Sequence, residues 1–291
     1  MSDHNDDESA LDRSEELARS VGLPFDREKT RELTRHLHDH YFRRLLKILP
    51  DVPPGLQFDA LALRTLDAFI SGDDNRIVFD EQIDFWLMTC AQLNTIAACF
   101  EMEPAEYQSL VKLFGDYSNI RANPFQHEEL RKRFWPYLNH YGAPALKLSH
   151  ALSRSMILFI ICHEIAHARL GHLQHPATPE HEWEADATAS DLWGLVIDAG
   201  ESAADIFVSP KIAGAPILMM RYLDLAERYH FRKSNRSPSR TTHPSPLSRA
   251  TRLRECLRSR LQMDTAAYLL NGFERTLDDL IKFEDLPEMP S

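Results

Sequence analysis

The sequence has little glycine, few cysteines, no long apolar run and no excess of positive charge. Glycine accounts for 10 of the 291 residues, while Leu, Ala, Arg and Glu recur at helical spacing over long stretches. This composition favours a mostly helical protein over a β-sandwich or a β-barrel. We therefore expect a mainly α fold, of the α+β type, with only a small sheet edge.

The cysteines are too few and too far apart to suggest a disulfide framework or a zinc ribbon. They are Cys90, Cys99, Cys162 and Cys256, and no CxxC pair occurs. All four lie in apolar helical patterns, which is typical of buried thiols in a reducing compartment. Cys162 directly precedes a histidine, so a role as a metal ligand or in redox chemistry is the alternative for this residue.

Long apolar runs are also missing. The longest nearly unbroken run is MILFIIC, residues 156–162, whereas a membrane-spanning helix needs about 20 residues. Residues 1–22 form an acidic leader without the basic and apolar regions of a signal peptide. We expect a soluble, cytoplasmic protein with no integral membrane segment.

The charge balance argues against a nucleic-acid-binding protein. The net charge is −11, and a nucleic-acid interface needs a basic surface. One segment is locally basic, and nucleic-acid binding through this segment is the alternative. Because its arginines spread around much of one predicted helix, we interpret them as a solvated face; they are Arg249, Arg252, Arg254, Arg258 and Arg260.

The chain divides into a leader, an N-terminal region over residues 23–140 and a C-terminal region over residues 141–291. In the N-terminal region, β-branched and aromatic residues after a turn predict one strand at residues 75–80. Helical patterns predict helices over residues 26–49, 58–70, 81–102, 104–114 and 126–140.

The C-terminal region contains the most apolar helix that we predict, over residues 145–173. The segment YGAP before it predicts a break. Residues 232–246 are rich in Ser, Arg and Pro and lack periodicity, which predicts a mobile loop or lid. Further helices are predicted over residues 181–199, 217–231, 247–261 and 265–283.

The motif HEIAH, residues 163–167, contains two candidate metal ligands and a candidate general base. A helix advances about 100° per residue, so His167 returns to within about 40° of His163. Two imidazoles one turn apart on one face can bind one tetrahedral Zn²⁺. Glu164 lies beside them, where its carboxylate can take a proton from a water that zinc activates.

The third ligand is not the next histidine. A metzincin would place it at position 173, which is Leu173, whereas His172 lies about 180° from His163 on a continuing helix. We therefore predict that His172 faces away from the site. The helix that begins near His181 offers Glu182 as the third ligand and Asp186, one turn later, as the group that orients a zinc-bound histidine.

HEIAH followed by EWEAD, residues 182–186, resembles the gluzincin metallopeptidases with an HExxH…ExxAD pattern. These include relatives of the CAAX prenyl protease and the heat-shock membrane protease, and more loosely the phage-exclusion protease Lit and repressor-cleaving proteases. The segment THPSPLSR, residues 242–249, resembles their late HP…R segment. The resemblance implies a zincin-like active helix, His243 near the substrate carbonyl as a transition-state stabiliser, and Arg249 as a structural or oxyanion-side partner.

Together these features predict a zinc-dependent endopeptidase that acts on a protein or peptide, including the case of one specific host or regulatory protein. Tyr222 and Tyr229 are alternatives to His243 for stabilising the oxyanion. The alternative function is a zinc-containing regulatory or binding protein without turnover. Such a structural site would be closed by a fourth protein ligand, for which His172, His181 and Cys162 are the candidates.

Overall fold

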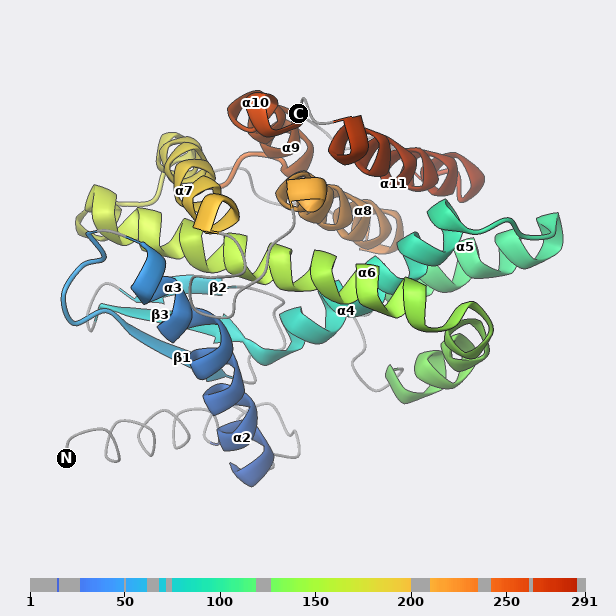
Figure 1. Ribbon diagram of the computed structural model, residues 1–291, viewed down its shortest axis with the longest axis horizontal. Helices are drawn as coiled ribbons and strands as arrows, with labels where there is room; N and C mark the ends of the chain where they lie inside the picture. Colours follow the sequence, from blue (N-terminus) through green and yellow to red (C-terminus); the bar gives the residue numbers. More distant parts are fainter. Residues whose placement is uncertain are drawn as a thin grey trace.

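The computed structural model describes Glu15 and residues 27–49, 51–61, 68–71, 75–118, 127–199, 210–234, 242–261 and 264–286. The acidic leader over residues 1–22 lies outside this part of the chain, except for Glu15. The fold is mainly helical with one small sheet, which confirms the predicted fold class. Figure 1 shows the long helix α6 (His127–Leu170) through the middle of the molecule.

The chain begins with a helical segment that matches the prediction for residues 26–49. It consists of α2 (Arg27–Leu37), a π-helical turn (His38–Phe42) and α3 (Arg43–Ile48). Its apolar side chains Leu37, Phe42 and Leu45 are buried in the core. The segment therefore covers the sheet, and α2 packs against the first strand.

The sheet corrects the prediction of a helix over residues 58–70. This stretch contains β1 (Gln57–Leu61) and β2 (Ala68–Ser71). Both pair with β3 (Arg76–Asp80), the strand predicted at residues 75–80, in the order β1-β3-β2. β1 is parallel and β2 antiparallel to β3, whose five residues are all buried. Pairing with this buried strand overrides the local helical pattern.

The helix α6 corrects the predicted break at YGAP. Gly142 and Pro144 lie within one helix instead of between two, and the predicted region boundary at residues 140 and 141 also falls inside it. A proline can kink a helix without ending it, and Figure 1 shows the ribbon changing direction near its right-hand end. The helix ends at Leu170, before a short 3-10 turn at His172–Gln174.

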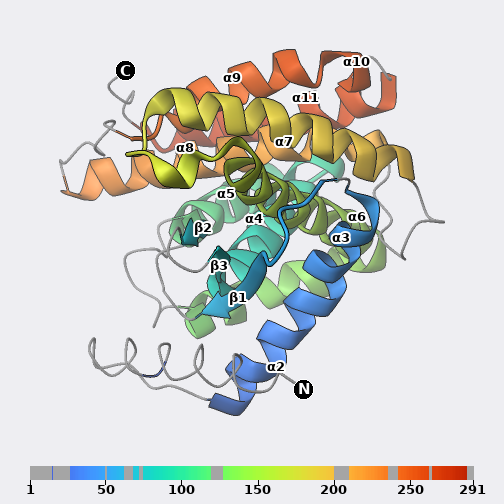
Figure 2. The same ribbon diagram turned by 90° about the vertical axis from the view of Figure 1, so that its left-hand side faces the viewer.

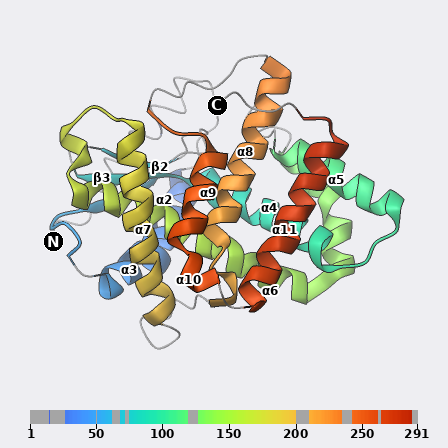
Figure 3. The same cartoon turned by 90° about the horizontal axis from the view of Figure 1, so that it is seen from above.

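Two layers enclose α6. The sheet and α4 (Glu81–Cys99) lie on one side of it, and α7 (Pro179–Ala199) lies on the other side in Figures 1 and 2. Seen from above in Figure 3, α7, α9, α8 and α11 form a row. The bounds of the remaining helices are α5 (Pro104–Ser118), α8 (Ala215–Ser234), α9 (Pro246–Cys256), α10 (Arg258–Leu261) and α11 (Asp264–Phe283).

The segment predicted as a loop over residues 232–246 is helical at both of its ends. Helix α8 continues to Ser234, and α9 begins at Pro246, where Ser245 caps it by accepting a hydrogen bond from the backbone amide of Ser248. Residues 235–241 lie outside the described part of the chain. The four described residues before α9 lead the chain toward the side of α6 that carries HEIAH.

One stretch of α6, Ala145–Leu170, is long and apolar enough to cross a membrane by length and composition. Buried core helices pass the same test, and 61% of the 18-residue window is buried inside this protein. Met156, Ile157 and Phe159 on this stretch are buried, and α6 packs against α4, α7 and α8. This burial favours a core helix.

Candidate metal centre

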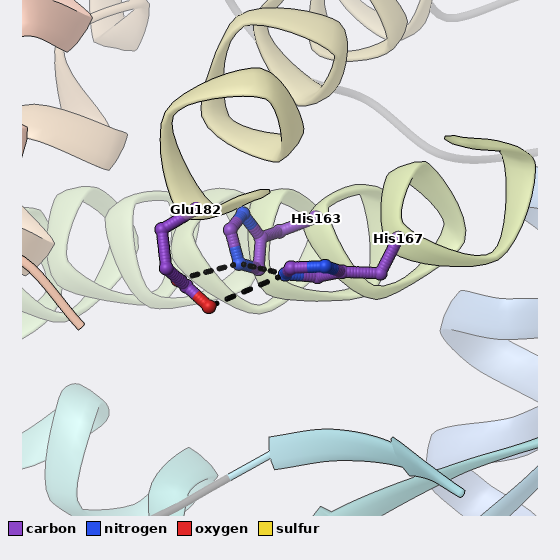
Figure 4. Close-up of side chains that lie close together, drawn as sticks. All are labelled: His163, His167 and Glu182. Atoms are coloured by element: carbon purple, nitrogen blue, oxygen red, sulfur yellow. Dashed lines mark hydrogen bonds and ion pairs between the residues drawn. The ribbon is translucent and has the colours of Figure 1, made fainter. Parts of the chain in front are cut away.

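Helices α6 and α7 bring together three side chains that could hold a metal ion, as Figure 4 shows. His163 and His167 lie one turn apart on α6, and Glu182 projects from the first turn of α7. The two histidine Nε2 atoms are 3.1 Å apart. Glu182 Oε2 lies 3.4 Å from His163 Nε2, and Glu182 Oε1 lies 3.5 Å from His167 Nε2. The three residues predicted as ligands therefore form one cluster.

The spacing of this cluster fits one tetrahedral zinc ion. Zn²⁺ binds imidazole nitrogen and carboxylate oxygen at about 2.0–2.2 Å, so neighbouring donor atoms of a tetrahedron lie about 3.3–3.5 Å apart. The observed separations of 3.1, 3.4 and 3.5 Å are close to these edges. Within the described residues, only these three form a group with metal-ligand geometry.

His163 is supported by a buried ion pair. Its Nδ1 lies 3.0 Å from Asp186 Oδ1, and Asp186 is fully buried one turn after Glu182. Arg249, on α9, donates to both carboxylate oxygens of Asp186 at 2.7 and 2.8 Å. Because a carboxylate accepts this bond, His163 carries its proton on Nδ1 and leaves Nε2 for a metal.

Arg249 also contacts Glu182, the predicted third ligand, since its Nη1 lies 3.1 Å from Glu182 Oε2. Burial raises the pKa of Asp186, but the charge and hydrogen bonds of Arg249 lower it more, to about 2. Burial likewise raises the pKa of Glu182, and its hydrogen bonds to the histidines together with Arg249 bring it well below the usual range. Both carboxylates are therefore held ionised.

The buried charges of the site favour a dication. Glu164, Glu182 and Asp186 are at most 5% exposed and carry three negative charges when ionised, against one positive charge on Arg249. Burial lowers the pKa of His163, but hydrogen bonds to Asp186 and Glu182 outweigh it and raise the value to about 9. Without a metal the excess negative charge thus attracts a proton, and a divalent cation would balance it instead.

His172 corrects our prediction that it faces away from the site. The helix ends before it, and Gly171 adopts the left-handed conformation, with φ of 72°, which turns the chain back. His172 is buried, and its Nδ1 lies 3.0 Å from Nδ1 of His167. Its Nε2 contacts Glu184 Oε2 at 3.1 Å, and its ring stacks on that of His181. His172 therefore contacts a predicted ligand without belonging to the ligand cluster.

The cluster opens into a cavity of about 420 Å³. Glu164 and His243 line this cavity, and His243 Nε2 lies 3.4 Å from Glu182 Oε1. Tyr222 and Tyr229, the alternatives to His243, are buried and lie outside the lining. The remaining lining is largely apolar; it includes Phe69 and Ile70 of β2, Trp86 of α4, Phe159 and Ile160 of α6, and Met219, Met220 and Leu223 of α8.

The basic segment around α9 does not form one cationic surface. Arg249 lies in the site, while Arg254 and Arg260 pair with Glu274 and Asp198. The guanidinium of Arg252 lies over the ring of Trp183, 5.2 Å from its centroid. The interpretation of a solvated face is therefore wrong for Arg249, whose side chain is only 12% exposed, and fits the more exposed Arg254 and Arg260 with their acidic neighbours.

The chain was compared with protein-family models, with curated proteins and with solved structures. No protein-family model, no curated protein and no solved structure matches the chain.

Proposed function

We propose that this protein is a zinc-dependent endopeptidase. The observation that carries the proposal is an ordered three-donor cluster of His163, His167 and Glu182 at the wall of a cavity that Glu164 also lines. Catalytic zinc sites use three protein ligands and keep a position open, whereas structural sites are closed by a fourth. The donor set of two imidazoles and one carboxylate suits zinc.

Each residue of the site has a separate role in peptide hydrolysis. Zinc held by the cluster supplies a Lewis acid that polarises a carbonyl and lowers the pKa of water. Glu164 takes the proton from the attacking water and returns it to the leaving amine. His243 donates a hydrogen bond to the oxyanion that develops on the scissile carbonyl. Asp186 and Arg249 hold His163 and Glu182 in their orientations.

The cavity suits an extended protein or peptide substrate. β2 is an edge strand of the described sheet, and Phe69 and Ile70 bring it to the cavity wall. An extended chain can add to such an edge through main-chain hydrogen bonds. The apolar side chains of α4 and α8 favour a substrate with a large apolar residue near the scissile bond.

The variant Glu164→Gln tests the mechanism. Gln keeps the size of the side chain but cannot accept the proton, so hydrolysis should fall by roughly 10²–10⁴-fold while zinc stays bound. Zinc content is measured by elemental mass spectrometry. Hydrolysis is measured by comparing the protein N-termini of cells that contain Glu164→Gln with those of cells that contain the unaltered protein. Glu180→Gln, an exposed carboxylate on α7, is the control. Unchanged proteolysis by Glu164→Gln would rule out this mechanism.

A zinc-containing regulatory protein is the alternative, and its site would be closed. Neither His172, His181 nor Cys162 belongs to the ligand cluster, which favours an open site. A hydroxamate should therefore bind the zinc-loaded protein. In protein loaded with cobalt in place of zinc, the same binding should shift the absorption spectrum. Absence of binding would support the closed, regulatory site.

A further inference from the structure

We propose that Glu184 and His172 form a hydrogen-bond relay that fixes the proton of His167 on Nδ1 and so keeps its Nε2 free to bind the metal. The inference deepens the proposed metal site and rests on it for its functional meaning. Three contacts carry the relay, from Glu184 Oε2 to His172 Nε2, from His172 Nδ1 to His167 Nδ1, and from His167 Nε2 to the ligand cluster.

The chemistry of the three groups sets the direction of this relay. A carboxylate can only accept hydrogen bonds, so His172 donates its Nε2 proton to Glu184. In a neutral imidazole the other nitrogen is then an acceptor, so His172 Nδ1 accepts the Nδ1 proton of His167. His167 Nε2, which lies 3.1 Å from His163 Nε2, is left with a lone pair. This is the tautomer that a metal requires.

The opposite direction would disable the site. If His172 donated from Nδ1, His167 would accept there and carry its proton on Nε2. That proton would point at His163 Nε2 and Glu182, where the metal would lie. Glu182 Oε1, 3.5 Å from His167 Nε2, competes for the His167 proton at the inner end, whereas the shorter contacts of 3.0 and 3.1 Å through His172 draw it to Nδ1. The carboxylate at the outer end of the relay therefore favours the tautomer in which His167 can be a ligand.

The surrounding chain holds His172 in the relay. Gly171, with φ of 72°, turns the chain at the end of α6, and His175 donates its backbone amide to the carbonyl of His172 at 3.1 Å. The ring of His181 stacks on that of His172 with a centroid separation of 4.3 Å and an angle of 12° between the planes. His172 thus keeps both ring nitrogens aimed along the relay.

Substitutions at Glu184 test the relay without disturbing the core, because this side chain is 63% exposed. Glu184→Gln can donate as well as accept, so the preferred direction is lost and zinc affinity should fall about 10-fold. Glu184→Lys can only donate, so it enforces the opposite direction and should lower the affinity about 100-fold. Glu180→Gln and Glu180→Lys, one turn earlier on α7, make the same charge changes outside the relay.

Zinc affinity is measured by competition with a chromophoric chelator on the full chain. The order Glu184→Lys, Glu184→Gln, unaltered protein, from weakest to tightest, supports the relay if the Glu180 variants match the unaltered protein. Equal affinities for the variants at positions 184 and 180 would overturn it. His172→Phe should also weaken zinc binding, and His172→Gln, whose amide oxygen can accept from His167, should restore part of the affinity.

A second readout separates this inference from the proposed hydrolysis. In zinc-free protein, nitrogen-15 NMR of the imidazoles should show His167 protonated on Nδ1, and Glu184→Lys should move the proton to Nε2. An Nε2-protonated His167 in the unaltered protein would overturn the relay. A protein with the Nδ1 tautomer that binds zinc but hydrolyses nothing would refute the endopeptidase proposal and leave the relay intact.

Discussion

The two histidines of the cluster are supported in opposite ways. His163 is backed by Asp186 and Arg249, a charged pair that is buried on α7 and α9. His167 is backed by His172 and then by Glu184, whose carboxylate is exposed to solvent. We call Asp186 and Arg249 the buried arm of the site, and His172 and Glu184 its exposed arm. Changes in the buried arm should lower the stability of the fold, whereas changes in the exposed arm should have little effect on folding. The difference predicts which substitutions change stability and which change metal affinity alone.

The largest effect is expected in the buried arm. Asp186→Ala leaves the guanidinium of Arg249 and the Nδ1 proton of His163 without their carboxylate partner. Breaking a buried ion pair in this way lowers the free energy of unfolding by about 3–5 kcal/mol. Denaturant unfolding in the presence of EDTA measures this loss without a contribution from bound zinc.

Helix α7 offers a matched control for this prediction. Asp198 pairs with Arg260 through two contacts of 2.8 and 3.0 Å, but its side chain is 63% exposed. Asp198→Ala should therefore lower the free energy of unfolding by less than about 1 kcal/mol. Equal losses for the two variants would contradict the contrast between a buried and an exposed arm.

The next effect is expected where the exposed arm begins. Gly171→Ala places a Cβ that meets no atom within 4 Å, so only the left-handed backbone at φ of 72° resists it. Such a conformation destabilises a non-glycine residue by about 1–2 kcal/mol. Because a change in this turn moves His172, zinc affinity should also fall, by about 10-fold. Both quantities are measured as for the previous variants.

Gly55→Ala is the control for the turn at Gly171. Gly55 has φ of 78°, and its added Cβ also meets nothing within 4 Å. The two variants should lose similar amounts of stability, but only Gly171→Ala should change zinc affinity. A loss of zinc affinity in both would show that the effect follows from destabilisation and not from the position of His172.

The contrast between the arms also explains which parts of the site the sequence could predict. The grouping of His163 and His167 and the placement of Asp186 one turn after Glu182 follow from helical periodicity, and the structure places these side chains together. The position of His172 depends instead on the backbone of Gly171, and a continuing helix predicts the opposite direction. Glu184 could be found only once that turn was known.

The same reasoning applies to the fold. The strand at β3 could be predicted because its own residues are β-branched and aromatic. β1 and β2 were predicted as a helix because their local pattern does not reveal pairing with a strand farther along the chain. The continuous helix α6 shows the same limit, since its packing against α4 and α7 is absent from the local signal of YGAP.

The smallest effect is expected at Asp84, a half-buried carboxylate on α4. Burial raises the pKa of Asp84, and the charges of His150 and Arg154 offset this only in part. The folded pKa therefore lies above the unfolded one. As the pH rises through this window, the unfolded chain releases its proton first, and the protein loses stability.

Asp84→Asn removes this titration and should make the protein more stable at neutral pH, by less than about 1 kcal/mol. The gain should disappear below about pH 3, under the unfolded pKa of about 3.9, where the carboxyl is protonated in both states. Urea unfolding of both proteins between about pH 3 and about pH 7 measures the difference. A variant that is less stable at neutral pH would show that His150 and Arg154 stabilise the Asp84 carboxylate. His150 and Arg154 would then act on the Asp84 carboxylate as Arg249 acts on that of Asp186.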